Sequence, residues 1–155
     1  MKNCLFCNIN EVLIFENKYF YSVFDIHPVS PGHALIIPKR HLDSILNLSK
    51  EEWEYLQVAI SGTIKNIEKT NFKKLYNNFL KKELSEKSVY FSKKMLSHIG
   101  INKKPDAYNI GNNDGDAAGR TINHLHIQII PRYYGDIDNP IGGIRNIIPD
   151  LGNYK

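Results

Sequence analysis

His124-Leu-His-Ile-Gln-Ile-Ile130 alternates polar and apolar residues over seven positions. Side chains alternate between the two faces of a strand, so the stretch predicts a strand with two unlike faces. The polar face carries His124, His126 and Gln128. The apolar face carries Leu125, Ile127 and Ile129. A solvent-facing polar strand is the alternative, but imidazole serves as a nucleophile or base near pH 7, and a glutamine amide can donate to a phosphoryl oxygen.

Further strands are predicted on either side of the middle of the chain. Tyr19 to Phe24 is aromatic and β-branched, and Ala34 to Ile37 is a short apolar run. The two prolines within Asp25 to Gly32 make the connection a loop. Ala107 to Ile110 is another predicted strand, and the glycines of Gly111 to Gly119 predict a tight turn near a ligand.

Helices are predicted between these strands. Ser49 to Glu52 has the form of a capping box, which predicts a helix start there. An apolar stripe at helical spacing is expected to pack on the sheet. Its members are Trp53, Leu56, Ile60, Ile64 and Ile67. Helical character is expected again from Phe72 to Ile99, with a break near Asn77-Asn78 and Ser85.

Charge is concentrated in one segment. Residues 62–104 contain eleven lysines and three glutamates, a local +8 that leaves −4 for the rest of a chain whose net charge is +4. This segment could hold phosphate or nucleic acid, but apolar residues at helical spacing between the lysines favour a solvated helical face. Nucleic acid is therefore not expected as a partner.

Length and hydropathy predict one folded domain over residues 1–155. The apolar content is 42%, and no apolar run approaches the roughly 18 residues of a membrane span. The first residues lack the apolar stretch of a secretory signal, so we expect the cytoplasm and no membrane association. In a reducing compartment, the Cys4 and Cys7 pair (CxxC) indicates a metal half-site or a redox pair, and the spacing alone does not decide between them.

Three stretches together carry a family resemblance. They are Asn113 to Arg132, Asp25 to His41, and Gly135 to Pro149. The first resembles the signature of the histidine triad (HIT) family of nucleotide hydrolases and transferases, here with an HxHxQ motif. The last is similar to the tail of a bacterial subgroup. The resemblance implies an α+β, HIT-like fold. It has an antiparallel sheet of about five strands, a long helix on one face, a helical insertion at about 62–104, and dimerisation through sheet edges.

The resemblance also implies roles for individual residues. His126 takes the position of the nucleophile that attacks the α-phosphorus and forms a covalent nucleotidyl-histidine. Gln128 holds the third triad position, and His33 resembles the histidine behind the nucleophile. Asn113 and Thr121 match phosphate contacts. Asp25 matches the residue that holds the ribose hydroxyls.

Most of these residues also have simpler interpretations. Without the resemblance, His33 reads as a buried histidine with its hydrogen bonds satisfied. Asp25 and Asn113 are common turn formers, and Thr121 could be a strand residue without a partner.

The resemblance changes the interpretation of the cysteines. Cys4, Cys7, His41 and His124 look like the four ligands of a structural Zn²⁺ in some family members, and two thiolates with two imidazoles suit tetrahedral zinc. Free buried thiols and a surface His41 are the alternative. No catalytic metal is required, because a histidine supplies the nucleophile.

The function implied is hydrolysis or transfer at the α-phosphate of a purine nucleotide derivative. Dinucleoside polyphosphates such as diadenosine tetraphosphate, and nucleoside phosphoramidates, are the expected substrates, and a homodimer is the expected assembly. Gln128 replaces the usual histidine, as in the transferase branch, so a dinucleoside polyphosphate phosphorylase or nucleotidyltransferase is an alternative. A non-enzymatic nucleotide or nucleic-acid binder is another. Arg120 stands where glutamine is common and adds positive charge nearby.

Overall fold

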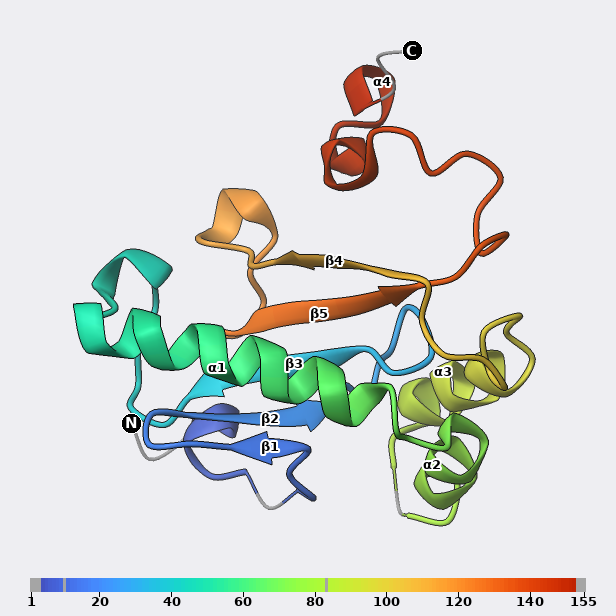
Figure 1. Cartoon of the computed structure of the whole chain (residues 1–155), viewed down its shortest axis with the longest axis horizontal. Coiled ribbons are helices and arrows are strands. Elements are labelled where there is room, and N and C mark those ends of the chain that lie inside the picture. The colour runs from blue at the N-terminus through green and yellow to red at the C-terminus, as the bar shows by residue number, and fades with distance from the viewer. Residues whose placement is uncertain (1–3, 10, 83, 153–155) are drawn as a thin grey trace.

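The fold is built on one antiparallel sheet. The computed structural model describes residues 4–9, 11–82 and 84–152, and five strands in it pair in the order β1-β2-β3-β5-β4 (Figure 1). The strands are β1 (Phe15–Glu16), β2 (Phe20–Phe24), β3 (Ala34–Pro38), β4 (Ala107–Gly111) and β5 (Ile127–Arg132). The expected α+β class and five-stranded sheet are confirmed. The two-residue β1 had no sequence signal.

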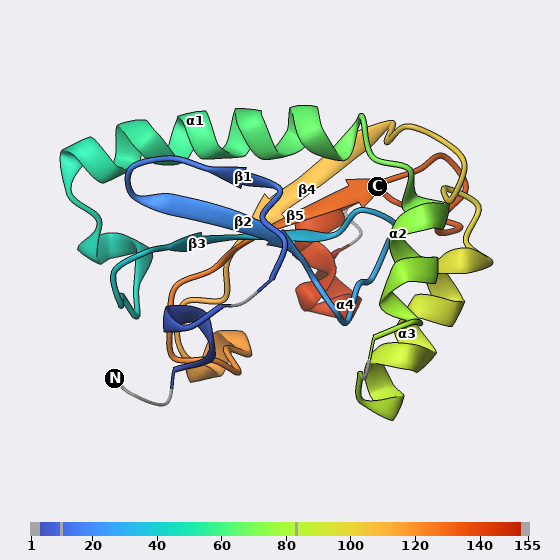
Figure 2. The ribbon, with the colours of Figure 1, turned by 90° about the horizontal axis from the view of Figure 1, so that it is seen from below.

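Helix α1 (Lys50–Ile67) begins where the capping box predicted. The Ser49 hydroxyl accepts from the amide of Glu52 at 3.2 Å, and the Glu52 carboxylate accepts from the amide of Ser49 at 2.7 Å. The helix lies along one face of the sheet (Figure 2). This arrangement confirms the long helix expected over the sheet.

The predicted stripe of α1 is partly wrong. Trp53 is 47% exposed, so it does not belong to the buried face of the helix. Five other residues of α1 are buried. They are Glu52, Leu56, Ala59, Thr63 and Ile67. Polar members of this set have partners: Thr63 donates its hydroxyl to the Ser22 hydroxyl of β2 at 2.9 Å. The prediction from large apolar residues therefore missed three of these five buried positions, Glu52, Ala59 and Thr63.

The helical region after α1 forms a hairpin of two helices. They are α2 (Phe72–Phe79) and α3 (Glu86–Leu96), capped by the side chains of Asn71 and Ser85. This confirms the expected break near Ser85. The α2–α3 hairpin lies beside one end of the sheet (Figure 2). No described helix is both long and apolar enough for a membrane crossing.

The two faces of the sheet have separate apolar clusters. The larger cluster joins α1 and the hairpin to Phe20, Ile36, Ile127 and Ile129. The smaller lies on the opposite face, where Tyr21, Val23, Leu35 and Ile37 meet Phe6. The register places Gln128 directly opposite Leu35 on this second face. The second face is therefore where the side chains of interest gather.

The predicted start of the last strand is wrong. Strand β5 begins at Ile127, so His124 and His126 lie in the irregular segment just before it. The amide of Leu125 donates to the carbonyl of Leu42 instead of to a neighbouring strand. The side chains still point alternately to the two faces of the sheet. Leu125 joins the α1 cluster, while His126 lines the pocket on the opposite face.

Candidate functional site

A cavity of about 580 Å³ opens on the face of the sheet opposite α1. Its walls come from the N-terminal segment, β2 and the loop after it, the start of α3, and the β4–β5 loop. Five lining residues carry sequence-predicted roles: Asp25, Asn113, Thr121, His126 and Gln128. The structure thus brings the candidate nucleophile, the candidate phosphate contacts and the candidate ribose contact into one pocket.

His126 is oriented by its own backbone. Its Nδ1 lies 2.9 Å from the carbonyl oxygen of His124, which can only accept, so Nδ1 carries the proton. The Nε2 lone pair is then free, and among the described residues it has no hydrogen-bond partner. The ring packs edge-on against Phe6 at 5.3 Å and is 9% exposed. This geometry leaves Nε2 of the imidazole available to the pocket as a nucleophile.

His33 is buried behind this pocket and does not line it. Its Nδ1 lies 3.6 Å from a carboxylate oxygen of Asp25. Burial lowers the pKa of His33 below its ordinary value, and the charge of Asp25 and the amide of Gln128 oppose this only in part. His33 is therefore neutral near pH 7. A positive charge on His126 lowers the pKa of His33 further.

Asp25 forms the predicted turn and also lines the pocket. One carboxylate oxygen accepts from the amide of His27 at 2.8 Å, which is the turn predicted for an aspartate before Pro28. The same side chain lines the pocket and faces His33 with its other oxygen. Forming a turn therefore places this carboxylate at the pocket rather than competing with a binding role.

The β4–β5 loop forms the wall that carries Asn113 and Thr121. Gly115 and Gly119 have φ angles of +100° and +84°, which side chains with a Cβ rarely adopt. Asn113 donates to the carbonyl of Gly119 at 3.4 Å, so this polar side chain crosses its own loop. Thr121 is exposed and borders the cavity.

Arg120 is not among the residues that line the cavity. Its guanidinium donates to the carbonyl of Asp43 at 2.6 Å. On the same loop, Asp114 accepts from the hydroxyl of Ser44 at 2.8 Å and from the amide of Ile45. Together with the Leu125 to Leu42 bond, these contacts fix the β4–β5 loop onto residues 42–45. Arg120 in this structure anchors the loop rather than lining the pocket.

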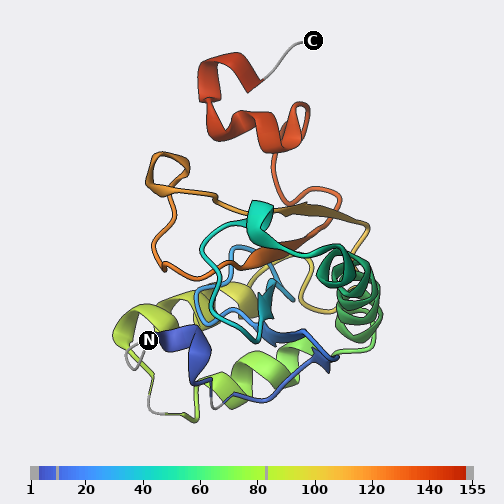
Figure 3. The ribbon, with the colours of Figure 1, turned by 90° about the vertical axis from the view of Figure 1, so that its left-hand side faces the viewer.

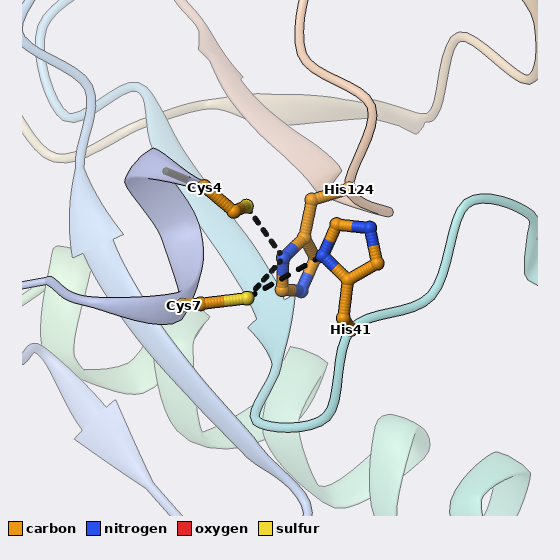
Figure 4. A group of neighbouring side chains, drawn as sticks. All are labelled: Cys4, Cys7, His41 and His124. Carbon is orange, nitrogen blue, oxygen red and sulfur yellow. Dashed lines mark hydrogen bonds between the residues drawn. The ribbon is translucent and has the colours of Figure 1, made fainter. Parts of the chain in front are cut away.

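Cys4, Cys7, His41 and His124 form a compact cluster next to the pocket (Figure 4). Their ligand atoms all lie within 4.8 Å of one another. The sulfur to Nδ1 distances are 3.3 Å for Cys4 to His124, 3.4 Å for Cys7 to His41 and 3.6 Å for Cys7 to His124. Tetrahedral zinc, with sulfur at about 2.3 Å and nitrogen at about 2.0 Å, separates these atoms by about 3.5 Å.

The second nitrogen of His124 also fits a metal ligand. His124 is fully buried, and its Nε2 lies 2.9 Å from the carbonyl of Pro38. A ligating histidine ordinarily donates its other N–H to such an oxygen, which fixes the ring orientation. The four residues could therefore hold a metal ion such as zinc.

Sequence reasoning missed several lining residues. Phe6, Glu11, His27 and Lys87 also border the cavity. His27 had no assigned role, and Lys87 belongs to the lysine-rich segment interpreted as a solvated face. No local pattern distinguishes Lys87 from its neighbours, because only the folding of the hairpin against the β2–β3 loop brings it to the pocket.

Comparison with known proteins shows which family the chain resembles. The HIT domain family pattern matches residues 7–85 and 75–135. An uncharacterized HIT-like protein of Methanocaldococcus jannaschii is 30% identical over 138 residues, covering 86% of this chain and 81% of that protein. Bis(5'-adenosyl)-triphosphatase of Saccharomyces cerevisiae is 29% identical over 127 residues, covering 81% of this chain but 46% of the yeast protein.

A solved structure supports the fold. The crystal structure of a HIT family member from Bacillus subtilis superposes with a TM-score of 0.58 at 24% identity, covering 86% of this chain and 76% of that one. The family pattern covers most of the chain, including all six histidines and every pocket-lining residue except Leu5 and Phe6. The chain therefore belongs to the HIT domain family.

Proposed function

We propose that the protein is a nucleotide hydrolase or nucleotidyltransferase that attacks an α-phosphate with Nε2 of His126. The observation that carries the proposal is the orientation of His126, with Nδ1 bound to the His124 carbonyl and the ring at the pocket wall. Family membership supports the same chemistry.

The proposed reaction has two steps. In the first, the Nε2 lone pair forms a nitrogen–phosphorus bond, and the bond from phosphorus to the leaving group breaks with its electron pair on the leaving group. In the second, water attacks the phosphorus, the nitrogen–phosphorus bond breaks and a proton is released. The His124 carbonyl stabilises the imidazolium-like ring of the intermediate through Nδ1.

Neutral donors around the pocket suit the developing negative charge. Gln128, Asn113 and Thr121 can each donate to phosphoryl oxygens without titrating. Asp25 is proposed to accept from the ribose hydroxyls. His33, neutral and buried beside Asp25, is proposed to hold that carboxylate in place.

The proposed substrates are purine dinucleoside polyphosphates, such as diadenosine tetraphosphate, or purine nucleoside phosphoramidates. The name of the yeast relative supports a diadenosine compound. The apolar part of the pocket, with Phe6, Ile9 and Phe24, suits a nucleobase. This chain spans less than half of the yeast protein, so its substrate is a proposal of its own.

The test is to trap the intermediate. The protein is mixed with radiolabelled diadenosine tetraphosphate, quenched in alkali, and digested to locate an acid-labile nucleotidyl adduct. We expect the label on His126 and none in His126→Ala, while the control His98→Asn, altered away from the pocket, still carries it. Label on another residue, or turnover without label, contradicts the mechanism. Nucleotide binding without turnover would favour a non-enzymatic binder.

Phosphorolysis is the second candidate, favoured by Gln128. Glutamine cannot protonate a leaving group, as a histidine at this position could. Diadenosine tetraphosphate is incubated with and without inorganic phosphate. A nucleoside diphosphate formed only with phosphate identifies a phosphorylase, whereas a monophosphate formed in both conditions identifies a hydrolase.

We further propose that the Cys4, Cys7, His41 and His124 cluster binds a structural Zn²⁺. The sulfur to nitrogen distances and the His124 to Pro38 contact support it. Bound zinc would tie the N-terminal segment to the segment that precedes β5. Metal analysis of the purified protein is expected to give one zinc per chain, and Cys7→Ser is expected to lower that content.

A homodimer is proposed as the assembly. Strand β4 is a sheet edge, and apolar side chains of the C-terminal segment beyond it are exposed. They include Ile144, Ile147, Ile148 and Leu151. Light scattering after gel filtration is expected to give twice the 17.9 kDa chain mass, and a monomer at micromolar concentration would contradict it.

A further inference from the structure

The α2–α3 hairpin supplies a cation to the pocket. Lys87, in the first turn of α3, lines the same cavity as His126 and Gln128. Lys82, also in the hairpin, is occupied by an ion pair with Glu11 at 3.1 Å. Within the described parts of the chain, no carboxylate forms an ion pair with Lys87. Lys87 is therefore the free positive charge among the lining residues described.

Lys87 stands at an unfavourable place for the helix itself. The first turn of a helix is the positive end of its dipole, where a cation is destabilising. Lys93 and Lys94, in the last turn of the same helix, are at the favourable end. Helix stability thus accounts for Lys93 and Lys94 but not for Lys87.

The position of Lys87 is held by its neighbours. The Ser88 hydroxyl, 1% exposed, lies 3.1 Å from Nε2 of His27, and the His27 ring packs edge-on against Phe91 at 5.6 Å. The amide of His27 in turn donates to Asp25. The start of α3 is therefore anchored to the loop that carries the proposed ribose contact.

The hairpin faces the pocket from the side away from the β4–β5 loop. Figure 2 shows α3 at the right and that loop at the left, both below the sheet, and Figure 3 also shows the two segments apart from each other. His126, Asn113 and Thr121 belong to the β4–β5 side. In a displacement at phosphorus, the leaving group departs on the side away from the nucleophile. A leaving group expelled by His126 is thus directed away from the β4–β5 side of the pocket.

We propose that Lys87 is a specificity-determining residue that binds an anionic leaving group, so that the pocket selects polyphosphate substrates over phosphoramidates. The inference rests on the proposed attack by His126 and names the substrate class of that site. A polyphosphate leaving group carries several negative charges that an ammonium can bind, whereas the amine expelled from a phosphoramidate has none.

The test compares two substrates that share the attacked adenylyl group. They are diadenosine tetraphosphate and adenosine 5'-phosphoramidate, and kcat/KM is measured for each with wild type, Lys87→Ala, Lys87→Glu and the control Lys93→Ala. For the tetraphosphate we expect a loss of about tenfold in Lys87→Ala, the size of one charged hydrogen bond, and a larger loss in Lys87→Glu. For the phosphoramidate we expect less than a twofold change, and Lys93→Ala should match wild type with both.

Equal losses for the two substrates, or no loss with the tetraphosphate, overturn the role of Lys87. If the wild type cleaves neither substrate, the proposed function fails, and binding decides the inference separately. Calorimetry then compares the affinities for adenosine tetraphosphate and adenosine monophosphate. We expect the preference for the tetraphosphate to fall about tenfold in Lys87→Ala, and an unchanged preference contradicts the inference.

Discussion

His124 and His126 are separated by one residue and have different surroundings. His124 is fully buried, and both ring nitrogens have partners, at Cys4 and at the Pro38 carbonyl. His126 uses only Nδ1, and the rest of its ring borders the cavity. A histidine with both nitrogens engaged is fixed as a ligand, whereas one with a free nitrogen beside a cavity can react. The same short stretch therefore contributes to a proposed structural half and a proposed reactive half of the site.

The largest expected effect is the loss of activity when His126, in the reactive half, is replaced. Loss of the nucleophile in His126→Ala should lower kcat by about 10⁴-fold or more, because no other described side chain replaces Nε2. The melting temperature should fall less than in His124→Ala, since His126 borders the cavity whereas His124 is fully buried. Steady-state kinetics and thermal unfolding check both. A variant that unfolds without losing specific activity would place His126 in the structural half.

Replacing His124 instead of His126 tests the structural half. His124→Ala, or removal of metal with a chelator, should lower the free energy of unfolding by several kcal/mol, because structural zinc sites contribute directly to folding. The readout is denaturant unfolding, with and without chelator. Chelator should leave the stability of His124→Ala nearly unchanged. If chelator leaves the wild type unchanged too, the cluster works as hydrogen-bonded thiols and imidazoles alone.

A smaller effect is expected at the ion pair beside His41. Glu52 is buried and accepts from Arg40 at 2.8 Å, and the bond to Arg40 lowers the pKa of Glu52 to about 2. A lowered carboxyl pKa stabilises the fold above the unfolded value of about 4.3, and this stability is lost as pH falls from there toward 2. At pH 7, Glu52→Gln should lower the free energy of unfolding by about 2 kcal/mol. Unfolding curves of variant and wild type should converge near pH 2, and a constant difference would contradict this.

The smallest expected effect concerns the anchoring of the β4–β5 loop. Arg120→Ala removes the bond to Asp43 and should lower kcat about tenfold, because it loosens the wall that carries Asn113 and Thr121. Arg120→Lys, which can still donate to the carbonyl, should recover part of the loss. A rise in KM with unchanged kcat would instead indicate a direct contact with substrate.

The sequence predicted features that are local. The capping box at Ser49, the helix break at Ser85 and the strands through Phe24 and Ile37 each depend on a few adjacent residues, and all are found. The α1 packing face was predicted only in part, because Thr63 and Ala59 face the sheet through small or hydrogen-bonded side chains. The start of β5 was misplaced because the bond from Leu125 to Leu42 joins segments far apart in the chain.

The residues of the candidate site also divide into those that local motifs predicted and those that only tertiary packing reveals. Asp25, Asn113, Thr121, His126 and Gln128 were named from motifs, and the fold brings them to one cavity. Their catalytic roles stay predictions. Lys87 and His27 could not be identified, because their place depends on how the hairpin packs on the β2–β3 loop through Ser88 and Phe91. Whether Arg120 lines the pocket was likewise decided by a contact with Asp43, 77 positions earlier.

The lysine-rich hairpin gives the molecule an uneven electric field. Residues 62–104 carry a net +8 against −4 elsewhere. The α2–α3 hairpin within this segment lies beside one end of the sheet and supplies Lys87 to the pocket. Such a field draws anions over about one Debye length, roughly 8 Å at physiological ionic strength. Added salt should therefore slow the association of polyanionic nucleotides more than their release, and capture from dilute solution becomes sensitive to the ionic composition around the protein.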